Sequence, residues 1–424
     1  MSAAVLLAAG VVVGPVAVPA AAEDTIRQQQ WHLDAMHAPE MWKITKGQGI
    51  TIAVIDGGFK LDHPDLAGQF LPGKDFSGSS GGVGSFGDGH GTGIASLIAG
   101  TGKGMGGTGA QGLAPGVKIL PLKINNGSSG ALVSNEFLGQ IGQAISYAVD
   151  QGVKVINISQ GMNAAVPAPE DVANLNGVIE AARAKGVLVV ASVGNEAQKG
   201  NPVEYPGALP GVVGVGAVDR DVIATAESEQ GPQVILSAPG MDMLAACTSS
   251  TGYCKSHGTS DSAALVSASA ALVWSAHPEW TANQILRVLI NTAGKPTDGS
   301  VRSVDVGYGV VRPRVALTEP GDPGPANVSP IPVGQTLPSA SPSATSTSAP
   351  SPSSAAPSPS DVAVGAPSVE PRVEKSSGSG GALPVVAGVV GGLVLVAGVV
   401  FVVLRRRKAG GRPVVPPGED PYVR

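Results

Sequence analysis

Residues Ser256–Trp274 read SHGTSDSAALVSASAALVW, and we expect the rest of the chain to be organised around this segment. A Gly-Thr-Ser sequence, Gly258 to Ser260, precedes a long run of small and apolar residues. Thr259 is of a type that caps helices, so we expect a buried helix with Ser260 in its first turn, surrounded by free backbone N–H groups. The apolar positions that repeat at helical spacing are Ala263, Val266, Ala270, Val273 and Trp274.

The serine at the start of this helix allows two interpretations. It could be a capping residue before a core helix. It could also be a nucleophile, which needs a base to take its proton and hydrogen-bond donors to hold the oxyanion that its attack creates. The stretch alone leaves both interpretations open, and the rest of the chain has to decide between them.

The composition of the 424-residue chain limits its class. Charged residues make up 14% and aromatic residues 4%, with 60 glycines and 35 prolines, which indicates a loop-rich chain with low-complexity segments. A net charge of −5 argues against a nucleic-acid-binding protein. Cys247 and Cys254, the two cysteines, are too few for a disulfide scaffold or a metal knuckle. We therefore expect no nucleic-acid partner and no metal site.

Apolar segments near both ends indicate export and membrane anchoring. Residues 1–22 end in Pro-Ala-Ala-Ala and are typical of a signal peptide, although no Lys or Arg precedes the apolar run; a buried N-terminal helix is the alternative. Residues 383–404 form an apolar run that would span about 33 Å as a helix, enough for a bilayer. The basic cluster 405–408 should stay in the cytoplasm, which puts everything before residue 383 outside the cell.

The rest of the chain divides into a lead-in, a folded domain, a linker and a tail. Residues 23–47 form a polar lead-in with a short helix near 35–42, too short for an inhibitory domain. Residues 48–317 carry the folded domain. The Pro/Ser/Ala-rich linker, residues 318–382, cannot bury enough apolar area to order itself, so we expect a semi-extended tether to the membrane. Residues 405–424 would be a cytoplasmic tail.

The folded domain alternates strands with helices. The expected strands are 49–56, 117–124, 153–159, 187–193, 212–218 and 234–237. The expected helices are 94–98, 134–151, 172–185, 281–293 and the helix after Gly258. This alternation predicts a three-layer α/β fold in which helices flank a mostly parallel central sheet. In such folds, ligands bind beyond the carboxyl ends of the strands.

Four polar residues fall where a ligand would bind. Asp56 closes the first strand, and Asn195 follows a later strand. His90, between two glycines, and Ser260 each open a helix. Each of the four also has an ordinary interpretation as a turn former or a helix cap, and His63 is a second histidine in a turn-like Asp-His-Pro-Asp-Leu sequence. Four such residues at one rim of the sheet favour a shared chemical site.

The motifs around these residues resemble those of the subtilisin-like serine proteases. The similar motifs, in that family's order, are Asp56-Gly57-Gly58, Gly89-His90-Gly91-Thr92 and Gly258-Thr259-Ser260. Asn195 is similar to the family's oxyanion-binding asparagine. The resemblance covers about residues 48–317 and implies a serine endopeptidase that works on protein or peptide substrates without a metal or organic cofactor.

The resemblance also implies a role for each residue. Ser260 would attack a peptide carbonyl, His90 would take and return the proton, and Asp56 would orient the imidazole, through an acyl-enzyme intermediate. Asn195 and the Ser260 backbone N–H would hold the oxyanion. The residues expected to bind substrate are Ser159, Gln160, Gly161 and Gly194, with Gln160 and the Gly194 region bordering the pocket for the residue before the cleaved bond.

The layout of the chain further resembles the mycosins, membrane-anchored subtilases associated with type VII secretion in actinobacteria. This implies type VII membrane components as partners and a single-pass protein of the cell membrane, with its catalytic domain outside. The competing hypothesis is a weakly active or inactive scaffold with a subtilase fold in a membrane secretion complex. An esterase is disfavoured, because Ser260 lacks a Gly-x-Ser-x-Gly sequence.

Two positions depart from the family's pattern. Gly93 stands where the family usually has His, and Asp261 begins a segment where Met-Ala-x-Pro is common. Asp261 suits a helix N-terminus. A carboxylate that faced the cleft would oppose the oxyanion, so we expect the Asp261 side chain to face away from it. Outside the cell Cys247 and Cys254 should form a disulfide; two buried unpaired thiols are the alternative.

Overall fold

The structure is a computed structural model, and it describes residues 25–125, 134–331 and residue 333. The expected signal peptide, most of the expected linker, the expected transmembrane helix and the expected cytoplasmic tail lie outside the described residues. No helix in the described part of the chain has both the length and the apolar character needed to cross a membrane.

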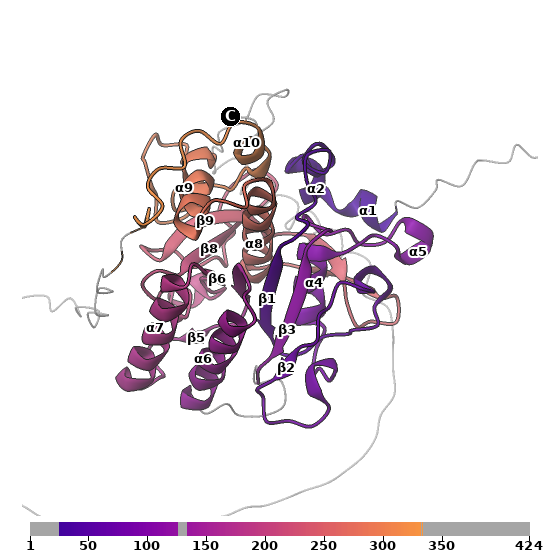
Figure 1. Ribbon diagram of the computed structural model, residues 1–424, viewed down its shortest axis with the longest axis horizontal. Coiled ribbons are helices and arrows are strands. Elements are labelled where there is room, and N and C mark those ends of the chain that lie inside the picture. Colours follow the sequence, from indigo (N-terminus) through magenta and orange to yellow (C-terminus); the bar gives the residue numbers. More distant parts are fainter. Residues whose placement is uncertain (1–24, 126–133, 332, 334–424) are drawn as a thin grey trace, which may run out of the picture. The chain divides into compact units, whose positions relative to one another are not determined.

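The described residues form a seven-stranded sheet in the order β2-β3-β1-β4-β6-β8-β9, and every neighbouring pair runs parallel (Figure 1). The strands are β1 (Thr51–Asp56), β2 (Lys74–Asp75), β3 (Lys118–Lys123), β4 (Val155–Ile158), β6 (Leu188–Ser192), β8 (Val213–Val218) and β9 (Val234–Pro239). The expected strands are all present, and the predicted parallel sheet is confirmed. Sequence patterns missed only the two-residue edge strand β2 of this sheet.

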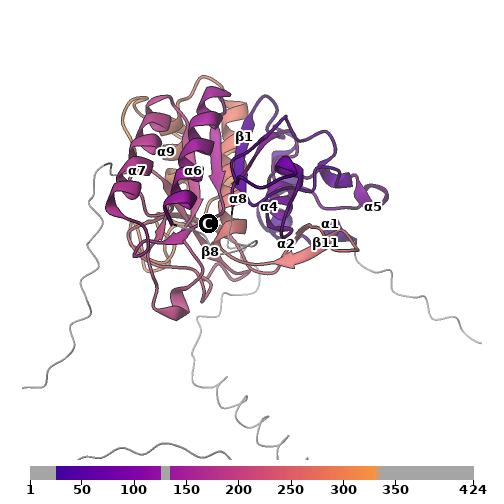
Figure 2. The same cartoon turned by 90° about the horizontal axis from the view of Figure 1, so that it is seen from below.

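Helices cover both faces of the sheet (Figures 1 and 2). One face carries α4 (His90–Ala99), α8 (Thr259–Ala276), α9 (Ala282–Thr292) and α10 (Pro313–Thr318), and the other carries α6 (Ser134–Asp150) and α7 (Pro169–Ala184). In β1, Ile52 and Val54 pack into the first layer, whereas Ala53 and Ile55 pack into the second. Burial on both sides explains why the strands are continuous apolar runs.

Helix α8 lies in the middle of the protein. It packs on β4, β6, β8 and β9 and against α4, α9 and α10, and every residue from Thr259 to Trp274 is buried. This confirms the predicted core helix with Ser260 in its first turn. The expected cap is wrong, because the N-cap residue is Gly258 at φ 129° and the Thr259 hydroxyl bonds the Gly194 carbonyl instead, at 3.3 Å.

The lead-in forms three short helices, where the sequence predicted one: α1 (Ile26–Gln29), α2 (Trp31–Ala35) and α3 (Ala38–Met41). The Gln30 side chain bridges backbone groups of Gln111 and Leu244 at 2.8–3.0 Å. Leu33 and Met41 are fully buried in the same core as α8. The lead-in is therefore packed on the folded domain through buried contacts.

Several small elements complete the fold. The 3-10 turns and the remaining short helix are η1 (Pro64–Leu66), η2 (Gly82–Gly84), η3 (Ala197–Lys199) and α5 (Gly104–Gly107). Antiparallel pairs are formed by β5 (Met162–Asn163) with β7 (Glu204–Tyr205), and by β10 (Met243–Ala246) with β11 (Tyr253–Ser256). The β10–β11 hairpin carries the predicted disulfide between Cys247 and Cys254, which is confirmed.

Removing this disulfide should destabilise the protein. The bond closes a loop of seven-residue separation directly before α8. For a loop this short, chain entropy predicts that the double variant Cys247→Ser/Cys254→Ser loses about 2–3 kcal/mol of unfolding free energy. Denaturant unfolding of the variant and the oxidised wild type measures the difference. Ser250→Ala, exposed in the same loop, serves as the control, and equal unfolding free energies for all three proteins would contradict the prediction.

Candidate active site

The buried end of β1 and the exposed start of α4 bring an acid and a histidine together. Asp56 is fully buried, and its two carboxylate oxygens lie 2.9 and 3.0 Å from His90 Nδ1. The imidazole remains 34% exposed. The carboxylate accepts a hydrogen bond from Nδ1–H, so the proton of the neutral ring stays on Nδ1. Nε2 is then unprotonated and can accept a proton, which is the tautomer that a general base needs.

Two further groups hold this Asp–His pair in place. The Gly57 N–H donates to Asp56 Oδ1 at 2.8 Å, and the Gln160 amide nitrogen lies 3.2 Å from both Asp56 Oδ1 and His90 Nδ1. Gly91 has no room for a side chain, because a Cβ there would overlap the Gly58 backbone carbonyl oxygen and lie 3.0 Å from Asp56 Cβ. Sequence reasoning assigned Gln160 to the substrate pocket and missed this contact, which arises because β4 pairs with β1.

The charges around His90 favour its protonated form. Burial lowers the pKa of the imidazole, but the Asp56 carboxylate raises it through its charge and hydrogen bond, and the charges of Asp261 and Asp88 raise it further. The result is a pKa of about 9. A histidine with this pKa is stabilised as a cation, which is the form that it takes after accepting a proton.

Ser260 lies at the carboxyl-end rim of the sheet, next to β4. Its side chain is 9% exposed, and its hydroxyl donates to the Ser159 carbonyl at 3.1 Å. The Ser159 hydroxyl donates in turn to the Ser260 carbonyl at 3.0 Å. Among the described residues no hydrogen bond joins Ser260 to His90. Catalytic hydrogen bonds often tighten only when substrate binds, so this arrangement leaves a nucleophilic role for Ser260 open.

Asn195 follows β6 and is exposed beside the first turn of α8. Its amide oxygen accepts from the Thr259 N–H at 2.8 Å and from the Thr259 hydroxyl at 3.1 Å. These contacts hold the oxygen against α8, which leaves the NH₂ group of the amide to face elsewhere. The Asn195 side chain is thus held against Thr259, the residue that precedes Ser260 in the chain.

Two other residues singled out from the sequence have defined places. His63 is the buried N-cap residue of η1. Its Nε2 lies 2.9 Å from the Gly252 carbonyl, and its Nδ1 accepts from the Asp65 N–H at 3.2 Å, which fits the expected turn. Asp261 is 4% exposed, and its Oδ2 accepts from the Ser256 hydroxyl at 2.7 Å. Burial raises the pKa of Asp261 to about 6, although Ser256 and His90 lower it.

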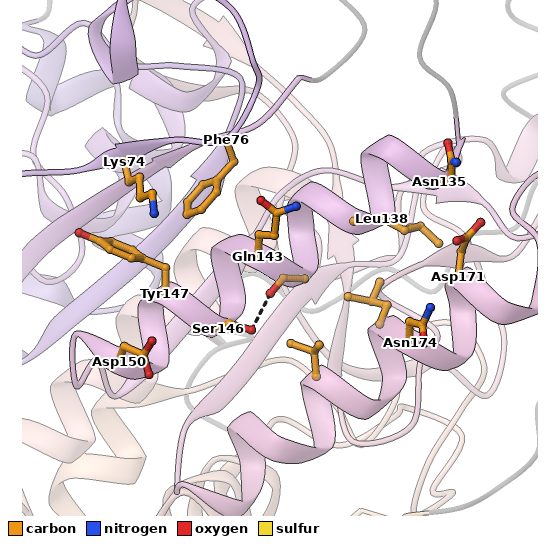
Figure 3. Close-up of a pocket in the computed structure, with 14 residues that line it drawn as sticks. Lys74, Phe76, Asn135, Leu138, Gln143, Ser146, Tyr147, Asp150, Asp171 and Asn174 are labelled. Carbon is orange, nitrogen blue, oxygen red and sulfur yellow. Dashed lines mark hydrogen bonds between the residues drawn. The ribbon is translucent and has the colours of Figure 1, made fainter.

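A separate pocket of about 490 Å³ lies between α6 and α7, on the other face of the sheet from α8 (Figure 3). Phe76, Tyr147 and Leu175 contribute apolar walls, and Lys74, Asp150 and Asp171 contribute charges. None of the candidate site residues lines it. The candidate site residues therefore lie outside this pocket.

The fold is that of a serine protease of the subtilisin class, and comparison with known proteins agrees. The subtilase family pattern matches residues 47–311. The chain therefore belongs to the subtilase family of serine proteases. The major intracellular serine protease of Bacillus subtilis is 35% identical over 255 residues, which cover 58% of this chain and 75% of that protein.

Other relatives and solved structures give the same family. Subtilisin DY of Bacillus licheniformis is 32% identical over 58% of this chain and 85% of its own length. For an intracellular serine protease of Paenibacillus polymyxa, 34% identical, the match spans only 63% of the relative. The crystal structure of MycP1 from Mycobacterium smegmatis has a TM-score of 0.62 and 26% identity over 75% of this chain and 91% of its own.

A second structural neighbour belongs to the same group. It is the MycP3 protease from the type VII (ESX-3) secretion system, with a TM-score of 0.59 and 29% identity over 68% of this chain and 88% of its own. The predicted resemblance to the subtilases is therefore confirmed, with proteases of type VII secretion systems among the structural neighbours. The segments that we expect to direct export and membrane anchoring lie outside the described residues.

Proposed function

We propose that this protein is a serine endopeptidase that cleaves exported proteins with Asp56, His90 and Ser260 as its catalytic triad. The observation that carries the proposal is the contact of a fully buried Asp56 with a partly exposed His90, at 2.9 Å, on the rim where Ser260 opens α8. A scaffold would not need a histidine whose tautomer is set and whose cation is stabilised by charge.

The reaction follows from the positions of these groups. When substrate binds, the Ser260 hydroxyl exchanges its bond to the Ser159 carbonyl for one to His90 Nε2 by rotation about its Cα–Cβ bond. Its oxygen attacks the peptide carbonyl while His90 accepts the proton, and Asp56 stabilises the resulting cation. Asn195 and the Ser260 N–H hold the oxyanion. His90 then protonates the leaving amine, and water hydrolyses the acyl-enzyme by the same steps.

The proposed setting is the outer side of the cell membrane, with type VII secretion components as partners. Two observations support it. MycP1 and MycP3, components of type VII secretion systems, are structural neighbours at 26–29% identity. The apolar run 383–404 followed by basic residues is typical of a single membrane anchor with its C-terminal end in the cytoplasm.

A fluorophosphonate probe tests the proposed function against the scaffold hypothesis, because it reacts only with an activated serine. The full-length protein should be labelled, with the label mapped to the peptide containing Ser260. Ser260→Ala should not be labelled, whereas Ser275→Ala, at the other end of the same helix, should react like the wild type. A correctly folded wild-type protein that neither reacts nor cleaves peptides would favour the scaffold.

Loss of the Asn195 donor should slow the chemical step. We expect Asn195→Ala to lower kcat by on the order of 10²–10³ with a small change in KM, since the oxyanion forms only in the transition state. Steady-state kinetics on one peptide substrate measures both constants. Asn174→Ala, exposed on α7, is the matched control. A larger change in KM than in kcat would contradict the assigned role.

The pH profile should report the titration of His90. Only neutral imidazole accepts the Ser260 proton, so a pKa of about 9 predicts that kcat/KM rises with pH up to about that value. Asp261→Asn removes one of the charges that raise this pKa and should move the rise to lower pH. Glu279→Gln, exposed beyond α8, should leave the profile unchanged.

The same variant tests the orientation of the Asp261 carboxylate. If its side chain faces away from the cleft, the plateau value of kcat should change by less than about tenfold, equivalent to roughly 1.4 kcal/mol. A larger rise would mean that the carboxylate opposes the oxyanion. An unshifted pH profile would mean that its charge does not act on His90.

A further inference from the structure

Two carboxylates lie against the glycines that border the candidate substrate site. The Glu204 carboxylate occupies the place where a Cβ of Gly161 would be, and the Glu229 carboxylate occupies the place where a Cβ of Gly194 would be. Neither glycine could carry a side chain without displacing the acid beside it. The two glutamates are therefore part of how this region is built.

Glu229 is a buried acid that lacks a partner. Its side chain is fully buried, and neither carboxylate oxygen has a hydrogen bond of normal geometry. Burial and the charge of Glu204 raise its pKa to about 8, while the Glu196 backbone N–H acts in the opposite direction. Buried polar groups in folded proteins are almost always paired, so an unpaired carboxyl group at this place indicates that a partner from outside completes it.

Glu204 shares the same surroundings. It is half-buried in β7, and burial together with the charge of Glu196 raises its pKa to about 7. Glu196 itself pairs with the exposed Lys199 at 2.9 Å. In the described part of the chain no Lys, Arg or His forms an ion pair with Glu204 or Glu229, and no group of acidic residues, His or Cys there has the geometry of a metal site.

The position of these acids relative to Ser260 is set by hydrogen bonds. Gly161 lies two residues after Ser159, whose carbonyl accepts from the Ser260 hydroxyl. Gly194 precedes Asn195, and its N–H and carbonyl both lie 3.3 Å from the Thr259 hydroxyl. Segments 159–161 and 194–195 thus both contact the first turn of α8, which carries the nucleophile. Gly161 is exposed and Gly194 is buried, and neither carries a side chain that would separate a substrate side chain from the acid beside it.

We propose that Glu204 and Glu229 form the end of the pocket for the residue before the cleaved bond, and that this pocket takes a Lys or Arg side chain. The inference rests on the proposed function, because it needs Ser260 to be the nucleophile. A long cationic side chain supplies the donors that Glu229 lacks, and its single positive charge offsets one of the two negative charges that the acids can carry. An apolar side chain would leave the buried carboxyl unpaired, and an acidic one would add a third negative group.

Peptide substrates that differ only in the residue before the cleaved bond test this specificity. We expect kcat/KM for Arg and Lys to exceed that for Leu and Gln by at least about tenfold. Glu204→Gln/Glu229→Gln should lower kcat/KM for the cationic substrates by at least about tenfold and change it for Leu by less than about threefold. The control, Glu170→Gln/Glu180→Gln, removes two exposed acids from α7 and should keep the preference.

A binding measurement separates this proposal from the proposed function. Full-length Ser260→Ala should bind a product peptide that ends in Arg more tightly than the same peptide ending in Leu, and Glu204→Gln in that background should reduce the difference. Equal binding of the two peptides, or equal loss for both substrates in the double variant, would overturn the inference. Failure of the fluorophosphonate reaction would instead count against Ser260 as the nucleophile.

Discussion

Replacing Ser260 by Ala is expected to lower kcat for peptide cleavage by on the order of 10⁶, because the side chain that forms the acyl-enzyme is gone. The remaining rate would come from substrate binding and oxyanion stabilisation alone. Full-length protein and an internally quenched peptide give the measurement, with enzyme concentrations high enough to follow the residual rate. KM should change little, since Ser260 contributes its hydroxyl to chemistry and not to binding.

The controls for this variant come from the same helix. Ser260 is buried and bonded to Ser159 on both its hydroxyl and its carbonyl, so the variant must be shown to fold, by thermal unfolding and circular dichroism. The control Ser275→Ala makes the same serine-to-alanine replacement in α8 but leaves the first turn of the helix unchanged. Activity of folded Ser260→Ala within tenfold of the wild type would end the assignment of the nucleophile.

Asp56→Asn should cost kcat on the order of 10⁴ while leaving the geometry nearly intact. Asparagine fills the same buried space, but its NH₂ group can donate to His90 Nδ1, which would then carry no proton and leave Nε2 protonated. A protonated Nε2 cannot accept the Ser260 proton. The ratio of wild-type to variant kcat should be smallest at low pH, because wild-type His90 is protonated below about pH 9, whereas the variant histidine, which has lost the carboxylate that stabilises its cation, is neutral at lower pH.

The exposed Asp62 provides the matched control for this second variant. It pairs with Lys60 at 3.3 Å on the surface and is 84% exposed, so Asp62→Asn should leave kcat unchanged. A loss in Asp56→Asn no larger than in Asp62→Asn would mean that the Asp56–His90 contact has no catalytic role. If Asp56→Asn lowers the unfolding temperature, kcat of both variants is measured well below that temperature, so that loss of folded protein does not contribute to the difference.

Local patterns were sufficient for most of the fold. Apolar runs ending in Asp56 or before Asn195 predicted parallel strands, because strands buried on both faces need apolar residues at every position. The helix that Ser260 opens was recognisable from its small and apolar residues, and its burial on all sides explains why it has no polar face. The β10–β11 hairpin was missed, since its short strands pair with each other outside the main sheet.

The candidate site was predictable as a set of residues but not as a set of contacts. Sequence motifs identified Asp56, His90, Ser260 and Asn195, because each of these residues is adjacent in the chain to the glycine or threonine residues of its motif. They did not reveal that the amide of Gln160 contacts the Asp–His pair. Nor did they reveal that the Ser260 hydroxyl is bonded to a neighbouring strand in this structure.

The sequence itself predicted the succession of strands and helices along the chain and the polar residues at the rim of the sheet. It also predicted the pairing of Cys247 with Cys254, the two cysteines of the chain. It did not predict the surroundings of Glu204 and Glu229. Their burial, their missing partners and their approach to Gly161 and Gly194 depend on segments far apart in the sequence that meet only after folding. Desolvation and charge act through space, so tertiary packing alone decides what a carboxyl group can bind.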